Sequence, residues 1–370
     1  MIRRARPWMG TLVSLFALAL GASGQSLCDF ELPESTIEIA ELSFAYRHYD
    51  DGRTSNVDSS SGWMSARFER LHDSPGLGYT MWATTRLELD TLVATSWVGS
   101  GSASYRYYFA EELPLFAYAG LRVDAATYYE QPGCELRSGL GIGRFRDVTP
   151  LARAFRIVAT LLDTGDLKRA LSTRTMLQIA GQISRVSSYD AFEDYVAAVA
   201  EAIGVAIGSP LDSAAVLAVR DELENEADER YCGAILQGGV GYELVDPYRG
   251  QEDILYVFSG DVGRALTPDS QLRCRLAWSG SSENFLGSNS STLDFTYSAD
   301  LPNSKGVRAG YAVRRDVAEE HEPLTTQGVT LEYTLGWGAA DLLVGLALSK
   351  QSGDPAWTVD LSISVALDLL

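Results

Sequence analysis

The chain has 370 residues, of which 46% are hydrophobic, 21% charged and 10% aromatic. This composition excludes a disordered chain, a collagen-like fibre and a simple disulfide scaffold. Acidic residues number 49 against 30 basic ones, and a formal net charge of -19 argues against nucleic acid as a partner. The mean hydropathy of -0.03 also excludes a helical membrane protein.

The first 24 residues have the pattern of a secretory signal peptide. Three arginines within the first six residues precede an apolar stretch from Trp8 to Leu20 and a small-residue cleavage site at 22–24. The stretch is too short for a retained membrane anchor. Leu27 stands where a lipidation signal needs a small residue before Cys28, so we expect export and cleavage without lipidation.

Alternating apolar and polar residues recur along the rest of the chain. Between Leu77 and Leu89, and again between Trp357 and Leu369, every second residue is mostly apolar while the residues between them are mostly polar. Such alternation predicts strands with one apolar face, and fourteen segments are expected: 36–48, 62–71, 76–89, 92–109, 113–129, 135–146, 232–245, 252–265, 270–280, 290–300, 306–317, 326–337, 340–350 and 356–370.

Strand length and number favour a membrane barrel over a soluble sandwich. Most segments exceed the five or six residues usual in globular sheets and fit the roughly 9 to 11 needed to cross a bilayer. An even number of strands suits a single-chain bacterial barrel. With both ends of the chain on the periplasmic side, the connections at 50–61, 281–289 and 318–325 face outward, and those at 73–75, 111–112, 267–269 and 336–338 face inward.

In this architecture the chain resembles the bacterial outer-membrane β-barrel proteins of porin-like design. The resemblance is one of architecture rather than of motif, and it covers the mature chain except for its middle segment. It implies a transmembrane antiparallel barrel in the outer membrane, in contact with its lipid. Members commonly end in an aromatic residue, whereas this chain ends in Asp368-Leu369-Leu370.

Residues 149–230 form the exception and predict an inserted helical module. Thr149 and Pro150 have the pattern of a helix cap and first turn, Gly165 ends that helix, and helical periodicity continues to about residue 227. Two half-barrels, 25–148 and 231–370, therefore flank the insert. Strand alternation places it in the periplasm, as a cap, plug or docking platform for a periplasmic protein.

The polar faces of the strands predict the residues that line the lumen, because charges are costly in lipid and acceptable around water. Acidic residues such as Glu69, Glu88 and Glu243 alternate with arginines, and mixed signs argue against strong ion selectivity. Alternatively, the opposite charges cross-link the interior and close it. The expected pore-lining residues are Arg67, Arg86, Arg106, Arg122, Asp124, Arg137, Arg273, Arg275, Asp294, Arg308, Arg314, Glu332 and Asp360.

Catalytic and metal-binding patterns are weak. The three histidines are scattered, without metal-ligand spacing, and we expect no metal and no cofactor. His48 with Asp50 and Asp51 is the one candidate for a rim hydrolase, and a solvated rim is the simpler interpretation. The glycines of 139–143 resemble a nucleotide-binding loop, but close packing in a barrel strand explains them better.

Four cysteines in an oxidising compartment allow three sets of pairings. Cys28 and Cys232 both fall on the expected periplasmic side and could form a disulfide. Cys274 shares a face with apolar residues and is expected to remain free towards lipid.

These observations predict a non-enzymatic outer-membrane barrel. Its expected function is a narrow channel for small polar solutes, or the exit port of an export system. The alternatives are a closed structural barrel that anchors a periplasmic partner, and a barrel hydrolase.

Overall fold

A computed structural model of the chain describes residues 27–32, 34–49, 59–110, 113–224, 229–250, 252–285, 287–302, 305–318, 322–337 and 340–368. The expected signal peptide and the last two residues lie outside the described residues.

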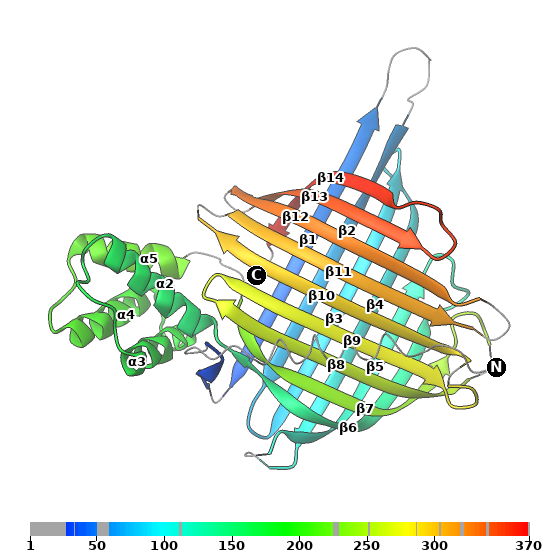
Figure 1. The fold of residues 1–370 in the computed structure, drawn as a ribbon, viewed down its shortest axis with the longest axis horizontal. Helices are drawn as coiled ribbons and strands as arrows, with labels where there is room; N and C mark the ends of the chain where they lie inside the picture. Colours follow the sequence, from blue (N-terminus) through cyan, green and yellow to red (C-terminus); the bar gives the residue numbers. More distant parts are fainter. Residues whose placement is uncertain are drawn as a thin grey trace.

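Fourteen antiparallel strands close into one barrel, which confirms the predicted fold class (Figure 1). Each strand pairs with its neighbours in sequence, and β1 pairs with β14 to close the ring. The strands are β1 (Ser35–Tyr49), β2 (Ser59–Asp73), β3 (Leu77–Asp90), β4 (Val93–Tyr108), β5 (Leu115–Ala126), β6 (Gly133–Asp147), β7 (Tyr231–Val245), β8 (Ile254–Thr267), β9 (Ser270–Ser281), β10 (Asn289–Leu301), β11 (Lys305–Val317), β12 (Leu324–Trp337), β13 (Ala340–Gln351) and β14 (Thr358–Asp368).

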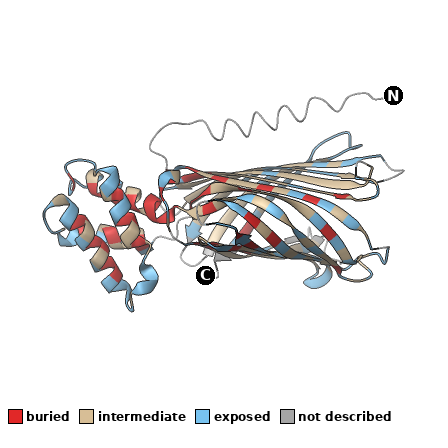
Figure 2. Cartoon of the chain, turned by 90° about the horizontal axis from the view of Figure 1, so that it is seen from below, coloured by how far each residue is buried: buried red, intermediate tan, exposed pale blue. Residues whose placement is uncertain are grey.

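The barrel is flattened rather than round. Strands β1 to β6 form one wall and β7 to β14 the other, and the strands of the two walls cross at different inclinations (Figure 1). Seen edge-on, the walls lie one above the other (Figure 2). Flattening brings side chains of opposite walls within reach of each other.

The outer surface of the barrel is apolar. On β14, Val359, Leu361 and Ile363 are 64%, 74% and 67% exposed, and Leu140 on β6 is 63% exposed. Large apolar side chains exposed over many strands are unfavourable in water and favourable against lipid. The residues between them carry the charged side chains inward.

Several connections differ in length between the two ends of the barrel, although the connection between β3 and β4, at the same end as the long ones, consists of residues 91–92 alone. At one end lie the connections between β1 and β2, β9 and β10, and β11 and β12, and at the other lie the shorter ones that follow β2, β8, β10 and β12. The end with the short connections also carries the helical insert. The connections predicted to face outward and inward therefore lie at opposite ends, apart from 111–112, which lie outside the described residues.

The insert forms a helical module beyond that end of the barrel (Figure 2). It consists of α2 (Thr149–Asp163), α3 (Thr173–Ile183), η2 (Val186–Ser188), α4 (Phe192–Ile207) and α5 (Ser213–Glu224). Apolar faces of all four α-helices pack into one core around Leu161, Ile179, Val199 and Val219. Burial raises the pKa of Tyr195 in this core to about 12, so its hydroxyl stays protonated and donates to the Ile183 carbonyl at 3.0 Å. No helix among the described residues is long and apolar enough to cross a membrane.

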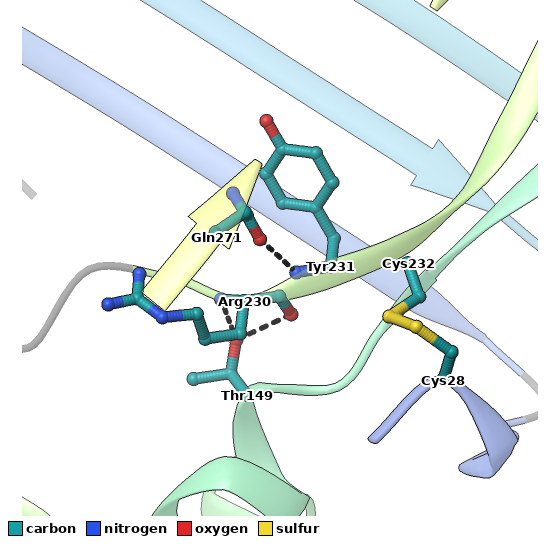
Figure 3. The surroundings of a disulfide bond; sticks show 6 residues. All are labelled: Cys28, Thr149, Arg230, Tyr231, Cys232 and Gln271. Atoms are coloured by element: carbon teal, nitrogen blue, oxygen red, sulfur yellow. Dashed lines mark hydrogen bonds between the residues drawn. A yellow bond between two sulfur atoms is a disulfide. The ribbon is translucent and has the colours of Figure 1, made fainter. Parts of the chain in front are cut away.

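The start of α2 differs from the prediction. Thr149 is the first residue of the helix and not its cap, and the residue at the cap position is Val148. The backbone N–H of Thr149 instead donates to Asp147 Oδ1 at 2.8 Å. Its hydroxyl accepts from the Arg230 N–H at 2.9 Å, so this threonine joins the two ends of the insert (Figure 3).

A disulfide and apolar contacts fix the module to the barrel, and a hydrogen bond holds the start of β7 in place. A disulfide joins Cys28 in the short helix η1 (Leu27–Asp29) to Cys232 at the start of β7 (Figure 3). The side chains of Leu27 and Phe30 beside it are buried in the helical core. The N–H of Tyr231 donates to Gln271 Oε1 at 2.7 Å, which links β7 to β9.

Two arginines complete this attachment. The fully buried Arg230 donates from Nη2 to Asp300 at 2.6 Å and to the Asp269 carbonyl at 2.9 Å. Arg156 of α2 pairs with Glu222 of α5 at 2.5 Å and donates to the Pro268 carbonyl at 3.1 Å. The module is thereby bonded to the turns after β8 and at the end of β10.

Candidate solute pathway in the lumen

The lumen is filled with apolar side chains near the helical module. They come from six strands, point to the same side as the lumen charges, and are each at most 6% exposed. We call this cluster the lumen plug; it comprises Ile37, Leu71, Tyr108, Phe116, Tyr118, Phe145, Tyr231 and Ile235. At its periphery the N–H of Asp147 on β6 donates to Ser35 Oγ on β1 at 3.0 Å, so the first wall curls back on itself here.

A buried carboxylate organises the plug. Asp73 accepts from the Tyr108 hydroxyl at 2.6 Å and from the Phe145 N–H at 3.2 Å, and it pairs with Arg106 at 3.5 Å. The Arg106 guanidinium lies 5.9 Å from the ring centre of Phe116. Asp73 and Arg106 are both 2% exposed. Each charge is therefore paired and hydrogen-bonded, as burial requires.

Charged side chains cross the lumen directly above the plug. Glu69 on β2 accepts from Arg273 on β9 at 2.8 Å and also from Arg275. Asp261 on β8 binds both arginines, with contacts of 2.5 Å to Arg273 and 3.3 Å to Arg275. Since β2 and β9 are seven strands apart in a ring of fourteen, they belong to opposite walls. These four residues form what we call the cross-lumen bridge.

The bridge extends along the lumen through a further chain of ion pairs. Arg67 binds Glu69 at 3.0 Å and Glu41 of β1 at 3.8 Å. Glu41 also lies 3.8 Å from Arg308 of β11, which is 3.8 Å from Glu332 of β12. The pairs at 3.8 Å are looser than those of the bridge, so this part of the network is easier to separate.

The remaining residues predicted to line the pore lie apart from the bridge. Four arginines pair with an acid two positions away on the same strand and so cross-link nothing; the pairs are Arg86–Glu88, Arg122–Asp124, Arg137–Glu135 and Arg314–Asp316. Asp294 is exposed and stands opposite Arg275 in the strand register, and Asp360 of β14 is exposed as well.

Two cavities open on the lumen beside the plug, and Tyr118 of the plug lines the smaller one. The larger has a volume of about 300 Å³ and is lined by β1 to β4, including Glu41, Ser65, Arg67 and Arg86. The smaller, about 100 Å³, is lined by β5 to β11, with Arg122, Arg137 and Arg314 at its surface. Polar side chains therefore surround the space that the plug and the bridge leave free.

The sequence offered candidate residues for metal binding, catalysis and nucleotide binding. Among the described residues no cluster of histidine, cysteine and acidic side chains could hold a metal ion. Asp50 and Asp51, the acids weighed with His48, lie outside the described residues. Gly139 and Gly141 pack closely, because a Cβ on Gly141 would lie 2.3 Å from the Phe116 ring and one on Gly139 2.2 Å from the Gly238 carbonyl.

The sequence analysis missed Glu41, Asp73 and Asp261 and the whole lumen plug. A signal for the plug was present, since Phe116 and Tyr118 stand in phase with Arg122 on the expected polar face of their strand. Apolar side chains on a lumen face indicate a filled interior.

Comparisons with known proteins assign no family and no function to the chain. No protein-family profile and no curated protein matches the chain. Solved structures similar to it include the KdgM porin (8% identity, TM-score 0.31, covering 90% of this chain and 100% of the porin). Another is a BenF-like porin from Pseudomonas fluorescens Pf-5 (8% identity, TM-score 0.35, covering 92% and 100%). A third is OccAB1 of Acinetobacter baumannii (8% identity, TM-score 0.34, covering 90% and 96%).

Because these identities and TM-scores are so low, no function can be transferred from these structures. The class of protein is therefore assigned from the chain's own strands. A closed ring of fourteen antiparallel strands with apolar side chains outside and charged side chains inside defines a β-barrel of porin-like architecture. No subfamily is assigned.

Proposed function

We propose that the chain is an outer-membrane barrel that conducts small polar solutes through a narrow lumen, and that the bridge and the plug together close this path. The observation that carries the proposal is the contact of Glu69 with Arg273 and Arg275 across the lumen. Ion pairs of this kind hold two walls together and can be replaced by water and solute when the walls separate.

The distribution of charge supports a channel over a permanently sealed barrel. Arg122, Arg137 and Arg314 line the smaller cavity, where a sealed barrel would gain more from apolar packing. A wide export port has less support, since the cavities on the lumen have volumes of only about 300 and 100 Å³.

A closed barrel that anchors the helical module for a periplasmic protein is the second candidate. Its supporting observation is the rigid attachment of the module through the Cys28–Cys232 disulfide and the buried Arg230. A membrane anchor needs such an attachment, whereas a solute channel does not.

Single-channel recording of the mature chain in planar bilayers tests the proposal, with Glu69→Gln beside the natural protein. Removing one partner of a buried ion pair costs roughly 3–5 kcal/mol. We therefore expect rare openings from the natural protein and frequent openings from Glu69→Gln, which leaves Arg273 and Arg275 paired with Asp261 of their own wall and without a carboxylate across the lumen. The positive charge that the lumen gains should also favour anions.

Glu88→Gln is the matched control. Glu88 pairs with Arg86 on its own strand, half exposed, and bridges nothing. It should conduct like the natural protein. Silence from all three proteins, with barrel formation shown by heat-modifiable gel migration, would reject the channel in favour of the anchor.

A further inference from the structure

The junction that closes the barrel is much shorter than the others. Among the described residues, β1 and β14 pair at four positions, from Glu41 with Asp368 to Phe44 with Val365. The other thirteen junctions each pair at ten positions or more. We call this junction the seam.

Beyond these four pairs the two strands diverge. β1 rises steeply and β14 runs at a shallow slope, so they separate towards the end of the barrel opposite the helices (Figure 1). In the described register, residues 45–49 of β1 pair with β2 alone, and residues 358–364 of β14 pair with β13 alone. A free strand edge in hydrocarbon costs several kcal/mol for each unpaired backbone group, as a rough scale, and is tolerated where it borders water.

The larger lumen cavity lies on the inner side of β1 beside the four pairs. It is lined by Glu41 and Ser43, which are themselves seam residues, and extends over Ser65 and Arg67 of β2. Its volume of about 300 Å³ is at the lower end of small-molecule sites. On the outside, Phe44 and Val365 of the seam are 44% and 45% exposed. A polar cavity and an apolar membrane face thus lie on the two sides of four strand pairs.

We propose that the seam is a lateral port, through which a single-chain amphipathic molecule with an anionic head passes between the membrane and this cavity. The head would bind Arg67 and Arg86, and the hydrocarbon chain would extend between β1 and β14. Arg67 pairs with Glu69 at 3.0 Å and with Glu41 only loosely, at 3.8 Å, so an incoming carboxylate can take the place of Glu41. This port is separate from conduction along the barrel axis.

The test measures whether a molecule in the membrane reaches Ser65. Ser65→Cys is made with Cys134→Ser and Cys274→Ser, so that one free thiol remains in the cavity. Phe44→His and Val365→His then place two imidazoles at directly paired positions, where Ni²⁺ clips the seam and a chelator releases it. The probes are a maleimide carried near the head of a membrane-resident fatty acid, its cationic-headed counterpart, and a small water-soluble maleimide.

We expect the clip to abolish labelling by the fatty-acid probe and the chelator to restore it, with labelling by the soluble probe unchanged. The control clip, Leu331→His with Leu346→His between β12 and β13, should have no effect. Unchanged labelling by the fatty-acid probe with the seam clipped would overturn the port. The port would also be overturned if the control clip reduced fatty-acid labelling as much as the seam clip, or if the seam clip reduced labelling by the soluble probe to the same extent. Equal labelling by the cationic probe would overturn the anionic head. Because each protein is compared with itself before and after chelation, misfolding cannot produce the expected pattern.

Discussion

Gly141 leaves room for the ring of Phe116 inside the lumen. A Cβ at this position would lie 2.3 Å from Phe116 Cζ and 2.7 Å from the Leu236 carbonyl oxygen. The ring could turn aside, but the backbone oxygen belongs to the neighbouring strand and has no such freedom. The glycine is therefore needed for the plug and for the pairing of β6 with β7.

We expect Gly141→Ala to destabilise the folded barrel by about 1–3 kcal/mol, as overpacking does in a close-packed core. The measurement is the urea midpoint of the detergent-folded protein, followed by heat-modifiable migration. Gly76→Ala is the control, because no atom lies within 4 Å of the Cβ that it would add. Equal midpoints for the two variants would show that the plug tolerates the extra methyl group.

Arg230 is the most deeply buried charge of the attachment between module and barrel. It is 0% exposed and bound to Asp300 at 2.6 Å. Its replacement leaves Asp300 near Arg156, but at the much longer distance of 3.9 Å. Arg156 therefore compensates only weakly for the loss of the ion pair between Arg230 and Asp300.

Arg230→Met should lower the stability of the attached module by roughly 3–5 kcal/mol, because it removes one partner of a buried pair. Limited proteolysis within residues 149–224 reports the loss as faster cleavage. Arg220→Met, which removes an exposed pair with Glu224 within α5, should be cleaved at the natural rate. Cleavage of Arg230→Met at that same rate would contradict the anchoring role.

At the scale of the elements, alternation predicted the strands well because a barrel wall separates lipid from lumen at every residue. The expected segment 232–245 corresponds to β7 at Tyr231–Val245, and 270–280 to β9 at Ser270–Ser281. The same pattern assigns each side chain to a face, so Arg273 and Arg275 could be directed inward from the sequence alone.

Contacts across the lumen could not be predicted in this way. Glu69 and Arg273 are brought together by the flattening of the ring, which depends on how both walls twist and pack. Strand alternation indicates the face towards which each side chain points, but it does not indicate the distance between the two walls. For the same reason the plug was missed, although its apolar residues stood in phase with the lumen charges.

The disulfide joins elements that strand pairing leaves independent, namely η1 and the start of β7. Cys28→Ser with Cys232→Ser should release η1 and withdraw Leu27 from the helical core. We expect a loss of about 2–5 kcal/mol in the stability of the module, as for other native disulfides. Its helical far-UV signal should melt at a lower temperature while the barrel keeps its heat-modifiable migration.

Cys134→Ser with Cys274→Ser is the matched control, since both of these cysteines are free. It should melt like the natural protein. If the barrel lost its migration together with the helices, the disulfide would be holding the barrel closed and not only the module in place.

At the scale of the whole molecule, the closure of the lumen and the helical module are separable. Every member of the plug and of the cross-lumen bridge comes from a strand. The module contributes to a different core, which meets the barrel at Cys232 and Ala265. The residues that we propose to close the lumen therefore belong to the walls, and the position of the module beyond the barrel end does not make it the plug.

This separation predicts the result of removing the module. Thr149 and Arg230 are hydrogen-bonded, so a short Gly-Ser linker can replace residues 150–228 without displacing β6 or β7. We expect the shortened barrel to stay as rarely open in planar bilayers as the natural protein, and Glu69→Gln to open it in both backgrounds. Steady current on deletion alone would show that the helices close the path. Loss of the Glu69→Gln effect on deletion would show that the module drives the separation of the walls, because breaking the bridge would then no longer suffice.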